Sequence, residues 1–266
     1  MTSITGAGLY TPASIYGQSA NRQANPTSAN AGNAAASNNS SAAGNSSSKT
    51  VADAVAAAAN SASYDFATVA QNARTVLDAG VAAYGQTPNS QTTEPQWIKI
   101  FGGMDRRSLY AVASNQGGQF SPQEQKVAKT LMDNQLANVS NVSSSESTSQ
   151  QIAGYTQQVN FLNNASPEEK NSASWTYSMA DAQTAARMTD IDSKMPQISG
   201  GNSPLLNMLM GAMYNVRSQA SGAVNFGTVN NLADITSQPW AKSYASQIEA
   251  AFAATNQPGG SYSVSV

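Results

Sequence analysis

The sequence predicts an all-α protein, an irregular bundle of about six or seven helices that follows a disordered N-terminal tail. Apolar residues recur at spacings of three and four through most of the chain after residue 50, as they do on the buried face of a helix. Residues 33–48 (NAAASNNSSAAGNSSS) offer nothing to bury, which predicts disorder. We therefore expect a low-complexity tail at 1–48, a helical domain at 50–256 and a C-terminal tail at 257–266.

The composition excludes several classes of function. Charged residues make up 11% of the 266 residues, well below the roughly 25% of an ordinary soluble domain, and the net charge is −2. No block of basic residues supplies the footprint of a nucleic-acid-binding protein. Cysteine and histidine are both absent, which rules out disulfides, thiol chemistry and every catalytic arrangement that needs an imidazole. We therefore expect a protein that is not an enzyme and has no cofactor.

The chain also lacks the usual membrane signals. It has no apolar run of about 20 residues, so no transmembrane helix is expected. The opening residues, MTSITGAGLYTPASIYG, carry neither the basic nor the apolar region of a Sec-type signal peptide. The expected location is therefore extracellular by a non-Sec route, or cytoplasmic.

The first helical pattern covers residues 50–84. Apolar and small side chains form one stripe from Phe66 to Tyr84, which predicts a helix packed closely against a neighbour. Gly85 and the TPNSQTTEP segment after it predict the end of this helix.

Residues 97–131 hold the clearest turn chemistry in the sequence. Asp105 opens one helix, which we expect to end at Gly117 and Gly118 in left-handed conformations. The next helix has Ser121 as its N-cap, Pro at its first position and a glutamate placed to return a capping-box bond. We expect four large side chains to hold this helix-turn-helix in the core: Trp97, Phe101, Leu109 and Phe120.

The second half of the chain predicts four more helices, after a Ser-rich connector at 138–151. Two of them begin with a Ser-Pro pair, at Ser166 and Ser203, where serine caps the helix and proline fits its first position. The expected helices are 151–162, 166–188, 203–217 and 237–256. Residues 223–229 predict a short extended piece.

Residues 109–131 resemble the helix-loop-helix of an EF-hand. With Gly118 at the sixth position of the loop, Ser121 falls at the ninth and Glu124 at the twelfth. An EF-hand needs carboxylates at its first, third and fifth positions as well, and these are Ala113, Asn115 and Gly117. The candidate ligands that the loop does offer are Asn115, Gln119, Ser121 and Glu124. One carboxylate is too few, so we expect a helix-turn-helix and no bound metal.

Two groups of side chains are candidates for binding a partner. Arg106 and Arg107 are able to clamp a carboxylate or phosphate bidentately, although exposure in the first turn of a helix is the more common arrangement for such a pair. The helix that starts at Ser203 carries three methionines, which suit either an adaptable binding face or the core. These methionines are Met208, Met210 and Met213.

The composition resembles that of bacterial proteins exported through flagellar or related type III channels, such as flagellins, hook-associated proteins and harpins. The resemblance rests on the absence of Cys and His, the few charges, the many Ala, Ser, Asn, Gln and Thr residues and the MTSITG start. The segment MDRRSLYAVASNQGGQFSPQEQ is similar to segments of uncharacterised alphaproteobacterial proteins. The chain ends in PGGSYSVSV rather than in the long apolar helix of a flagellin, so flagellin-like polymerisation is not expected.

These observations leave four functional hypotheses. The first is a non-enzymatic, exported bacterial protein that acts by protein binding or self-assembly. The second is a cytosolic helical adaptor or regulator, and the third a calcium-responsive protein with an EF-hand-like loop. The fourth, a hydrolase, would need two converging carboxylates such as Asp105 and Glu124. The Asp190-Ile191-Asp192 triplet is a further divalent-ion motif, and we expect its carboxylates to be solvated near a helix end.

Overall fold

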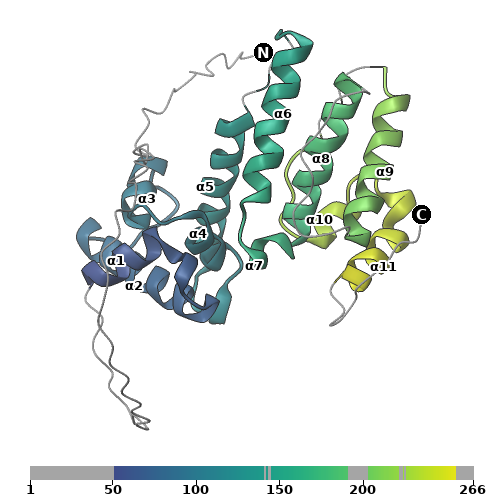
Figure 1. The fold of residues 1–266 in the computed structure, drawn as a ribbon. Helices are drawn as coiled ribbons and strands as arrows, with labels where there is room; N and C mark the ends of the chain where they lie inside the picture. The colour runs from purple at the N-terminus through teal and green to yellow at the C-terminus, as the bar shows by residue number, and fades with distance from the viewer. Residues whose placement is uncertain are drawn as a thin grey trace, which may run out of the picture. The chain divides into compact units, whose positions relative to one another are not determined.

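The computed structural model describes residues 51–140, 142, 145–190, 203–221, 224 and 226–255. Within these residues the chain forms eleven α-helices and three short 3-10 helices, with no β-strand, which confirms the all-α prediction (Figure 1). The elements are α1 (Val51–Ala59), η1 (Ser61–Ser63), α2 (Phe66–Tyr84), α3 (Glu94–Phe101), α4 (Arg106–Ala113), η2 (Gln116–Gly118), α5 (Pro122–Ser140), α6 (Thr148–Asn163), α7 (Pro167–Lys170), α8 (Ala173–Thr189), α9 (Pro204–Gln219), α10 (Leu232–Thr236), η3 (Lys242–Tyr244) and α11 (Ala245–Thr255). The predicted tails at 1–48 and 257–266 lie outside the described residues.

The helices outnumber the prediction because polar caps divide stretches that read as single helices. Asp65 accepts a bond from the Thr68 amide and starts α2, which separates it from α1. Ser172 accepts a bond from the Trp175 amide and starts α8 two residues after α7 ends. The predicted last helix is also divided, and its long regular part begins only at Ala245. Side-chain caps compete with continuation of a helix at each such residue.

A first hydrophobic core is built by α1 to α5, and we call it the N-terminal core. Its buried residues include the four side chains expected to hold the central segment, Trp97, Phe101, Leu109 and Phe120. The predicted stripe on α2 also faces this core, through Val69, Ala70, Ala73, Val76 and Leu77.

A second core, the C-terminal core, is built by α6 to α11. Helix α8 contributes Trp175, Met179 and Ala182, which are all fully or nearly fully buried. Ile248 of α11 is completely buried, and Tyr244 and Phe252, four residues away on either side, pack against the same core.

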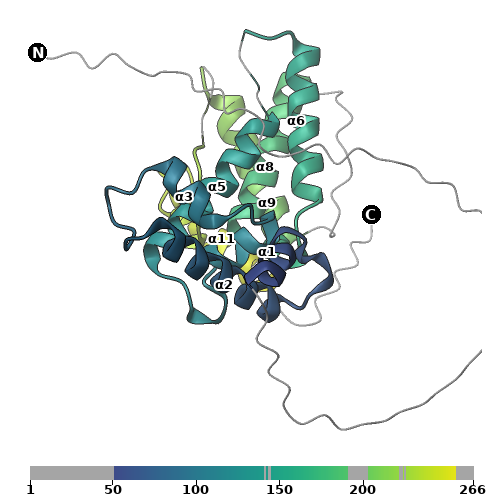
Figure 2. The same ribbon diagram turned by 90° about the vertical axis from the view of Figure 1, so that its left-hand side faces the viewer.

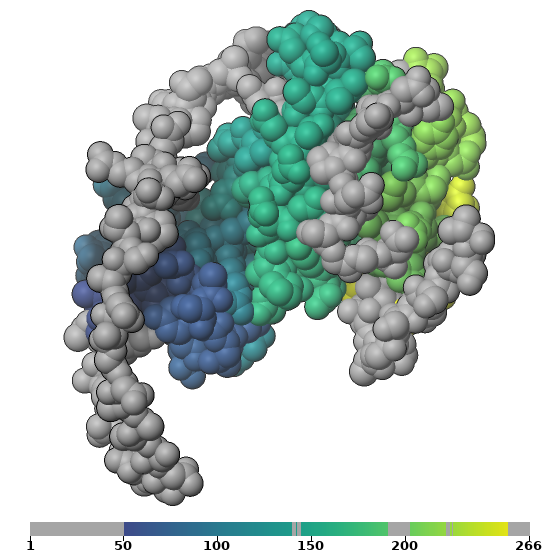
Figure 3. Space-filling model, in the orientation of Figure 1, coloured from purple at the N-terminus to yellow at the C-terminus, as the bar shows by residue number. Residues whose placement is uncertain are grey.

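Helix α5 joins the two cores. Its first half contributes Ala128 and Met132 to the N-terminal core, whereas Leu136, one turn further on, packs against the C-terminal core. In Figure 1, α5 and α6 lie between α1, α2 and α3 on one side and α8, α9 and α11 on the other. Figure 2 views the same helices from the side of α1, α2 and α3, and Figure 3 shows atoms of α5 and α6 filling the space between the two groups. The chain therefore carries two small cores around a shared helix.

The close approach expected for α2 occurs at Gly80. A Cβ atom added there would lie 2.2 Å from the carbonyl oxygen of Ile100 on α3. Only glycine permits this contact, because real Cβ atoms never come so close to a backbone atom.

The central turn follows the prediction with one difference. Ser121 and Glu124 form the expected capping box: the Ser121 amide donates to the Glu124 carboxylate at 2.8 Å, and the Glu124 amide donates to Ser121 Oγ at 3.3 Å. Gly117 and Gly118 are left-handed as expected, but α4 ends earlier, at Ala113. The first left-handed residue is Asn115 (φ 53°), whose side chain accepts a bond from the Phe120 amide at 2.9 Å.

The connectors differ from the prediction in length and conformation. Helix α5 extends to Ser140 and Ser147 caps α6, so the Ser-rich connector is shorter than residues 138–151. Of the piece expected to be extended, residues 224 and 226–229 are described and form no strand. Among the described helices, none combines the length and the apolar character needed to cross a bilayer.

Candidate functional site

Four arginines share one arrangement in which the guanidinium bonds a carboxylate and lies over a phenylalanine ring. The four sets are Arg74 with Glu124 and Phe120, Arg106 with Glu169 and Phe161, Arg107 with Glu168 and Phe66, and Arg217 with Asp181 and Phe226. A guanidinium suits this role because its planar fork bonds a carboxylate in-plane while its face stacks on a ring.

Two of these sets join the two cores side by side. Arg106 and Arg107 are adjacent on α4, and their partners Glu169 and Glu168 are adjacent on α7, about 60 residues later in the chain. We call these two ion pairs the double clasp. It is the polar counterpart of the apolar connection that α5 provides.

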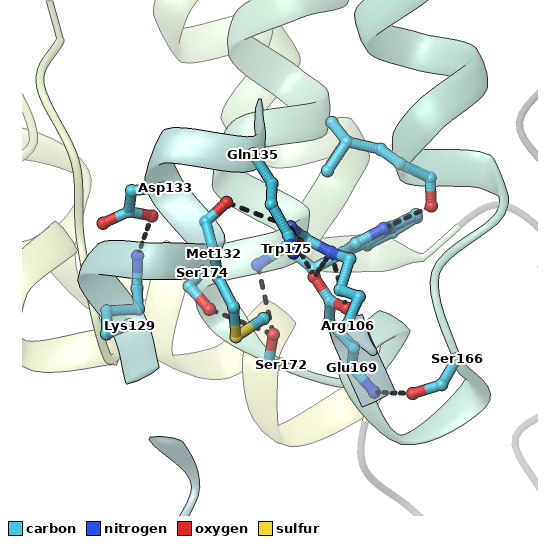
Figure 4. Close-up of polar contacts among 11 residues, drawn as sticks. Arg106, Lys129, Met132, Asp133, Gln135, Ser166, Glu169, Ser172, Ser174 and Trp175 are labelled. Carbon is cyan, nitrogen blue, oxygen red and sulfur yellow. Dashed lines mark hydrogen bonds and ion pairs between the residues drawn. The ribbon is translucent and has the colours of Figure 1, made fainter. Parts of the chain in front are cut away.

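The Arg106–Glu169 pair is the more buried half of the clasp. Arg106 Nη2 donates to Glu169 at 2.6 Å and Nε donates to both carboxylate oxygens at 3.0 Å. Its Nη1 donates to the Met132 carbonyl at 3.0 Å and to Gln135 at 3.3 Å, so the guanidinium has partners on both sides (Figure 4). The Glu169 side chain is only 4% exposed, and burial raises its pKa against the opposing effect of Arg106.

The Arg107–Glu168 pair is nearer to solvent. Arg107 donates to Glu168 at 2.6 and 3.1 Å, and its Nη1 donates to the carbonyls of Ser61 and Tyr64 at 2.8 Å. The hydrogen bond from Arg107 lowers the pKa of Glu168, because burial is too slight here to reverse it. Beside it, Asp105 caps α4 and accepts bonds from the amide and the hydroxyl of Ser61.

The expectation that Arg106 and Arg107 are exposed is therefore wrong. Their side chains are 18% and 16% exposed, and each clamps a glutamate of its own chain. The bidentate geometry anticipated for an external anion is present, but the anion is internal. Glu169 lies three residues after the N-cap Ser166, where a glutamate often returns a capping-box bond, but its carboxylate bonds Arg106 instead.

A half-open pocket of about 250 Å³ surrounds the Arg74–Glu124 pair. Arg74 donates to the two oxygens of Glu124 at 2.9 and 3.0 Å and also bonds Asp78 at 2.8 Å. Burial opposes the ionisation of Glu124, but the bonds from Arg74 and Ser121 outweigh it and lower the pKa. The charged groups of this pocket are thus already bonded to each other.

The candidate metal ligands of the central loop have protein partners. Asn115 accepts from Phe120, Ser121 and Glu124 bond each other, and the Gln119 carbonyl accepts from Arg74 at 3.3 Å. No group of three or more acidic side chains comes together within the described residues. The two carboxylates of the hydrolase hypothesis also have separate tasks, since Asp105 caps α4 and Glu124 bonds Arg74.

The methionine helix α9 divides its three methionines between core and surface. Met213 is completely buried, which confirms the core interpretation for it, while Met208 and Met210 are partly buried against the same core. Asp190 is the C-cap of α8, and the rest of its triplet, with Asp192, lies outside the described residues.

A groove between α8 and α9 differs from the other polar sites in the side chains that line it. It has a volume of about 400 Å³ and is lined by Thr184, Arg187, Asn207, Met210, Gly211 and Tyr214. Among the described residues, no acidic side chain lines it. A side chain at Gly211 would meet no atom within 4 Å, so the groove is open at this point.

Arg187 distinguishes this groove from the clasp. Of the five arginines in the described part of the chain, it alone has neither a carboxylate partner nor a phenylalanine under its guanidinium. Tyr214 beside it is 40% exposed, a large value for an aromatic residue of a packed helix. The groove therefore combines an available cation with an exposed aromatic ring and a methionine.

Sequence reasoning identified Met210 and missed the rest of the groove. A signal was present on α9, where Asn207, Gly211 and Tyr214 recur at spacings of four and three on the face opposite the buried leucines. Nothing in the sequence separates Arg187 from the arginines that have internal partners.

Comparisons of the chain with protein-family models, with curated proteins and with solved structures gave no match. The function of the groove is therefore argued from its own chemistry.

Proposed function

We propose that the chain is a non-enzymatic helical protein that acts by binding a partner protein in the α8–α9 groove. The observation that carries this proposal is the guanidinium of Arg187, which has no ion-pair partner among the described residues and lines the groove with Met210 and the exposed Tyr214. Arginine, methionine and tyrosine are the residues enriched at protein interfaces.

The arrangement of the carboxylates favours binding over catalysis. A general acid–base pair needs carboxylates that face a substrate pocket, and those of Glu124, Glu168 and Glu169 are each held by an arginine of the same chain. The α8–α9 groove itself has no acidic lining residue within the described part of the chain. Its chemistry is that of recognition.

A second part of the proposal concerns location. We propose export from a bacterial cell through a flagellar or related type III channel, and this part rests on the composition without Cys and His and with 11% charged residues. Fractionation of cells that express the full chain, next to a variant lacking residues 2–48, tests it. Export of the full chain and retention of the variant is the expected result, and retention of both would favour a cytosolic adaptor.

Site-specific photocrosslinking tests the binding function. We replace Tyr214 with a photoreactive phenylalanine analogue in the full chain, and Ile98 on α3, which is 41% exposed, in a matched control. A discrete adduct with a single protein is expected from position 214 and not from position 98. The same adducts from both positions, or none from position 214 in the native host, would contradict binding in the groove.

A further inference from the structure

The side chains that line the α8–α9 groove indicate the chemistry of its partner. We infer that the α8–α9 groove recognises an acidic segment of the partner protein, with one carboxylate bonded to Arg187 and an adjacent apolar side chain seated by Met210, Gly211 and Tyr214. This inference rests on the proposed binding function and specifies the ligand of that same site.

Charge complementarity identifies the carboxylate. The described lining contains one cation and no anion, so a neutral or cationic ligand would leave Arg187 uncompensated. A planar guanidinium binds a carboxylate through two parallel bonds, and Arg74, Arg106 and Arg107 each bond both oxygens of a glutamate of this chain. A phosphate monoester carries close to two charges and would leave one of them without a cation, because no second basic residue lines the groove among the residues that the structure describes.

The uncharged residues of the lining indicate that an apolar side chain of the partner lies next to its carboxylate. Gly211 leaves open space on α9, in a groove that Met210 and Tyr214 also line. A methionine and an aromatic ring contact apolar and aromatic side chains favourably, so a leucine or phenylalanine beside the acidic residue suits this space. Thr184 and Asn207 complete the lining with polar groups.

The exposure of the site indicates a protein segment rather than a free small carboxylate. Sites for small molecules enclose most of the surface of their ligand. Here Tyr214 keeps 40% of its surface in solvent and Arg187 is exposed. An open site of this kind is able to receive a side chain that projects from a larger surface.

The test uses nuclear magnetic resonance on the full chain with 15N-labelled arginine. The probe is an acetylated, amidated tetrapeptide in which glutamate follows phenylalanine, and its partner is the same peptide with glutamine in place of glutamate. We expect a saturable shift of the Arg187 Nε–H resonance with the glutamate peptide and affinity lower by about tenfold for the glutamine peptide, the loss that follows from one charge-assisted pair. Sodium propionate and the corresponding phosphoserine peptide serve as competing probes.

Two variants control for fold and for general charge. Arg187→Gln should reduce the affinity for the glutamate peptide by about tenfold, whereas Lys242→Gln, which removes an exposed cation on η3, should leave it unchanged. Gly211→Leu should weaken binding without removing charge, because its side chain fills the open space on α9.

The inference is overturned by equal affinity for the glutamate and glutamine peptides, by tighter binding of the phosphoserine peptide, or by propionate binding as tightly as the glutamate peptide. If the Asp192→Asn variant bound the glutamate peptide markedly more tightly, a carboxylate of the chain itself would be the ligand of the groove, and the inference would be overturned as well. Crosslinking separates the two proposals: an adduct at position 214 that persists in Arg187→Gln keeps the binding function and rejects the acidic segment.

Discussion

The double clasp and the α8–α9 groove use the same side chain in opposite ways. In the clasp, every nitrogen of the Arg106 and Arg107 guanidinium groups donates to a glutamate or a backbone carbonyl of the same chain. In the groove, Arg187 is exposed and has no carboxylate partner among the described residues. The difference separates arginines that hold the fold from one that is available to a partner.

The contrast between these arginines is informative because charged residues are scarce in this protein. Only 11% of residues are charged, and four of the five arginines in the described part of the chain each bond a carboxylate while lying over a phenylalanine ring. Two small cores joined by one shared helix gain a second connection from the clasp. The same residue type at position 187 has no comparable structural task.

The largest effect is expected from Arg106→Met. The substitution leaves the carboxylate of Glu169, 4% exposed, without its cation, and the loss in the free energy of unfolding should be about 3–5 kcal/mol. Equilibrium unfolding in urea measures it.

The double variant Arg106→Met/Glu169→Leu is the control for this prediction. Because it removes both charges together, it should recover most of the lost stability, as replacement of a buried ion pair by apolar groups usually does. A double variant as unstable as the single one would mean that the clasp is not held by this pair.

Gly80→Ala should have the next largest effect. Its new methyl group would lie 2.2 Å from the Ile100 carbonyl, so α2 and α3 must separate, at a cost of about 1–3 kcal/mol in the free energy of unfolding. Thermal unfolding followed by circular dichroism would show a lower Tm, and an unchanged Tm would contradict the close approach of the two helices.

The Arg107–Glu168 pair, the more accessible half of the double clasp, predicts that the stability of the protein depends on pH. Arg107 lowers the pKa of Glu168 below its ordinary value of 4.5, so the stability that this pair contributes is present above that pKa and is lost as the pH falls below it. Glu168→Gln should therefore lose roughly 1 kcal/mol at neutral pH and progressively less than that at acid pH. Urea unfolding at several pH values checks this, with Glu249→Gln, on an exposed part of α11, as the control.

A glycine of α9, Gly211, should respond in the opposite direction. Gly211→Ala adds a methyl group that meets no atom within 4 Å, so only the better helix propensity of alanine counts, and stability should rise by about 0.5–1 kcal/mol. A fall in Tm would show that the α8–α9 groove is filled.

The sequence was sufficient to predict much of the fold. The sequence predicted that Trp97, Phe101, Leu109 and Phe120 are buried, and the Ser-Pro pair at Ser121 predicted the start of α5 together with its capping box. These features depend on residues that are near each other in the chain, which is why local patterns report them.

The polar sites were harder to predict because their partners are distant. Arg106 and Glu169 lie 63 residues apart, and no local pattern indicates that they meet. The break at Ser172 was missed for a related reason, since a serine inside a helical pattern caps a new helix only where packing favours a change of direction. The availability of Arg187 becomes visible only once each of the other four arginines in the described part of the chain has been assigned a partner.

The most direct test of the distinction between Arg187 and the arginines of the clasp compares the unfolding free energies of Arg187→Gln and Arg106→Gln under identical conditions. Arg187→Gln should stay within about 0.5 kcal/mol of the unmodified chain, as exposed residues without structural partners do. Arg106→Gln should lose about 3 kcal/mol or more, because it leaves a buried carboxylate without its cation. Equal losses for the two variants would contradict the distinction between an arginine of the fold and an arginine of the binding site.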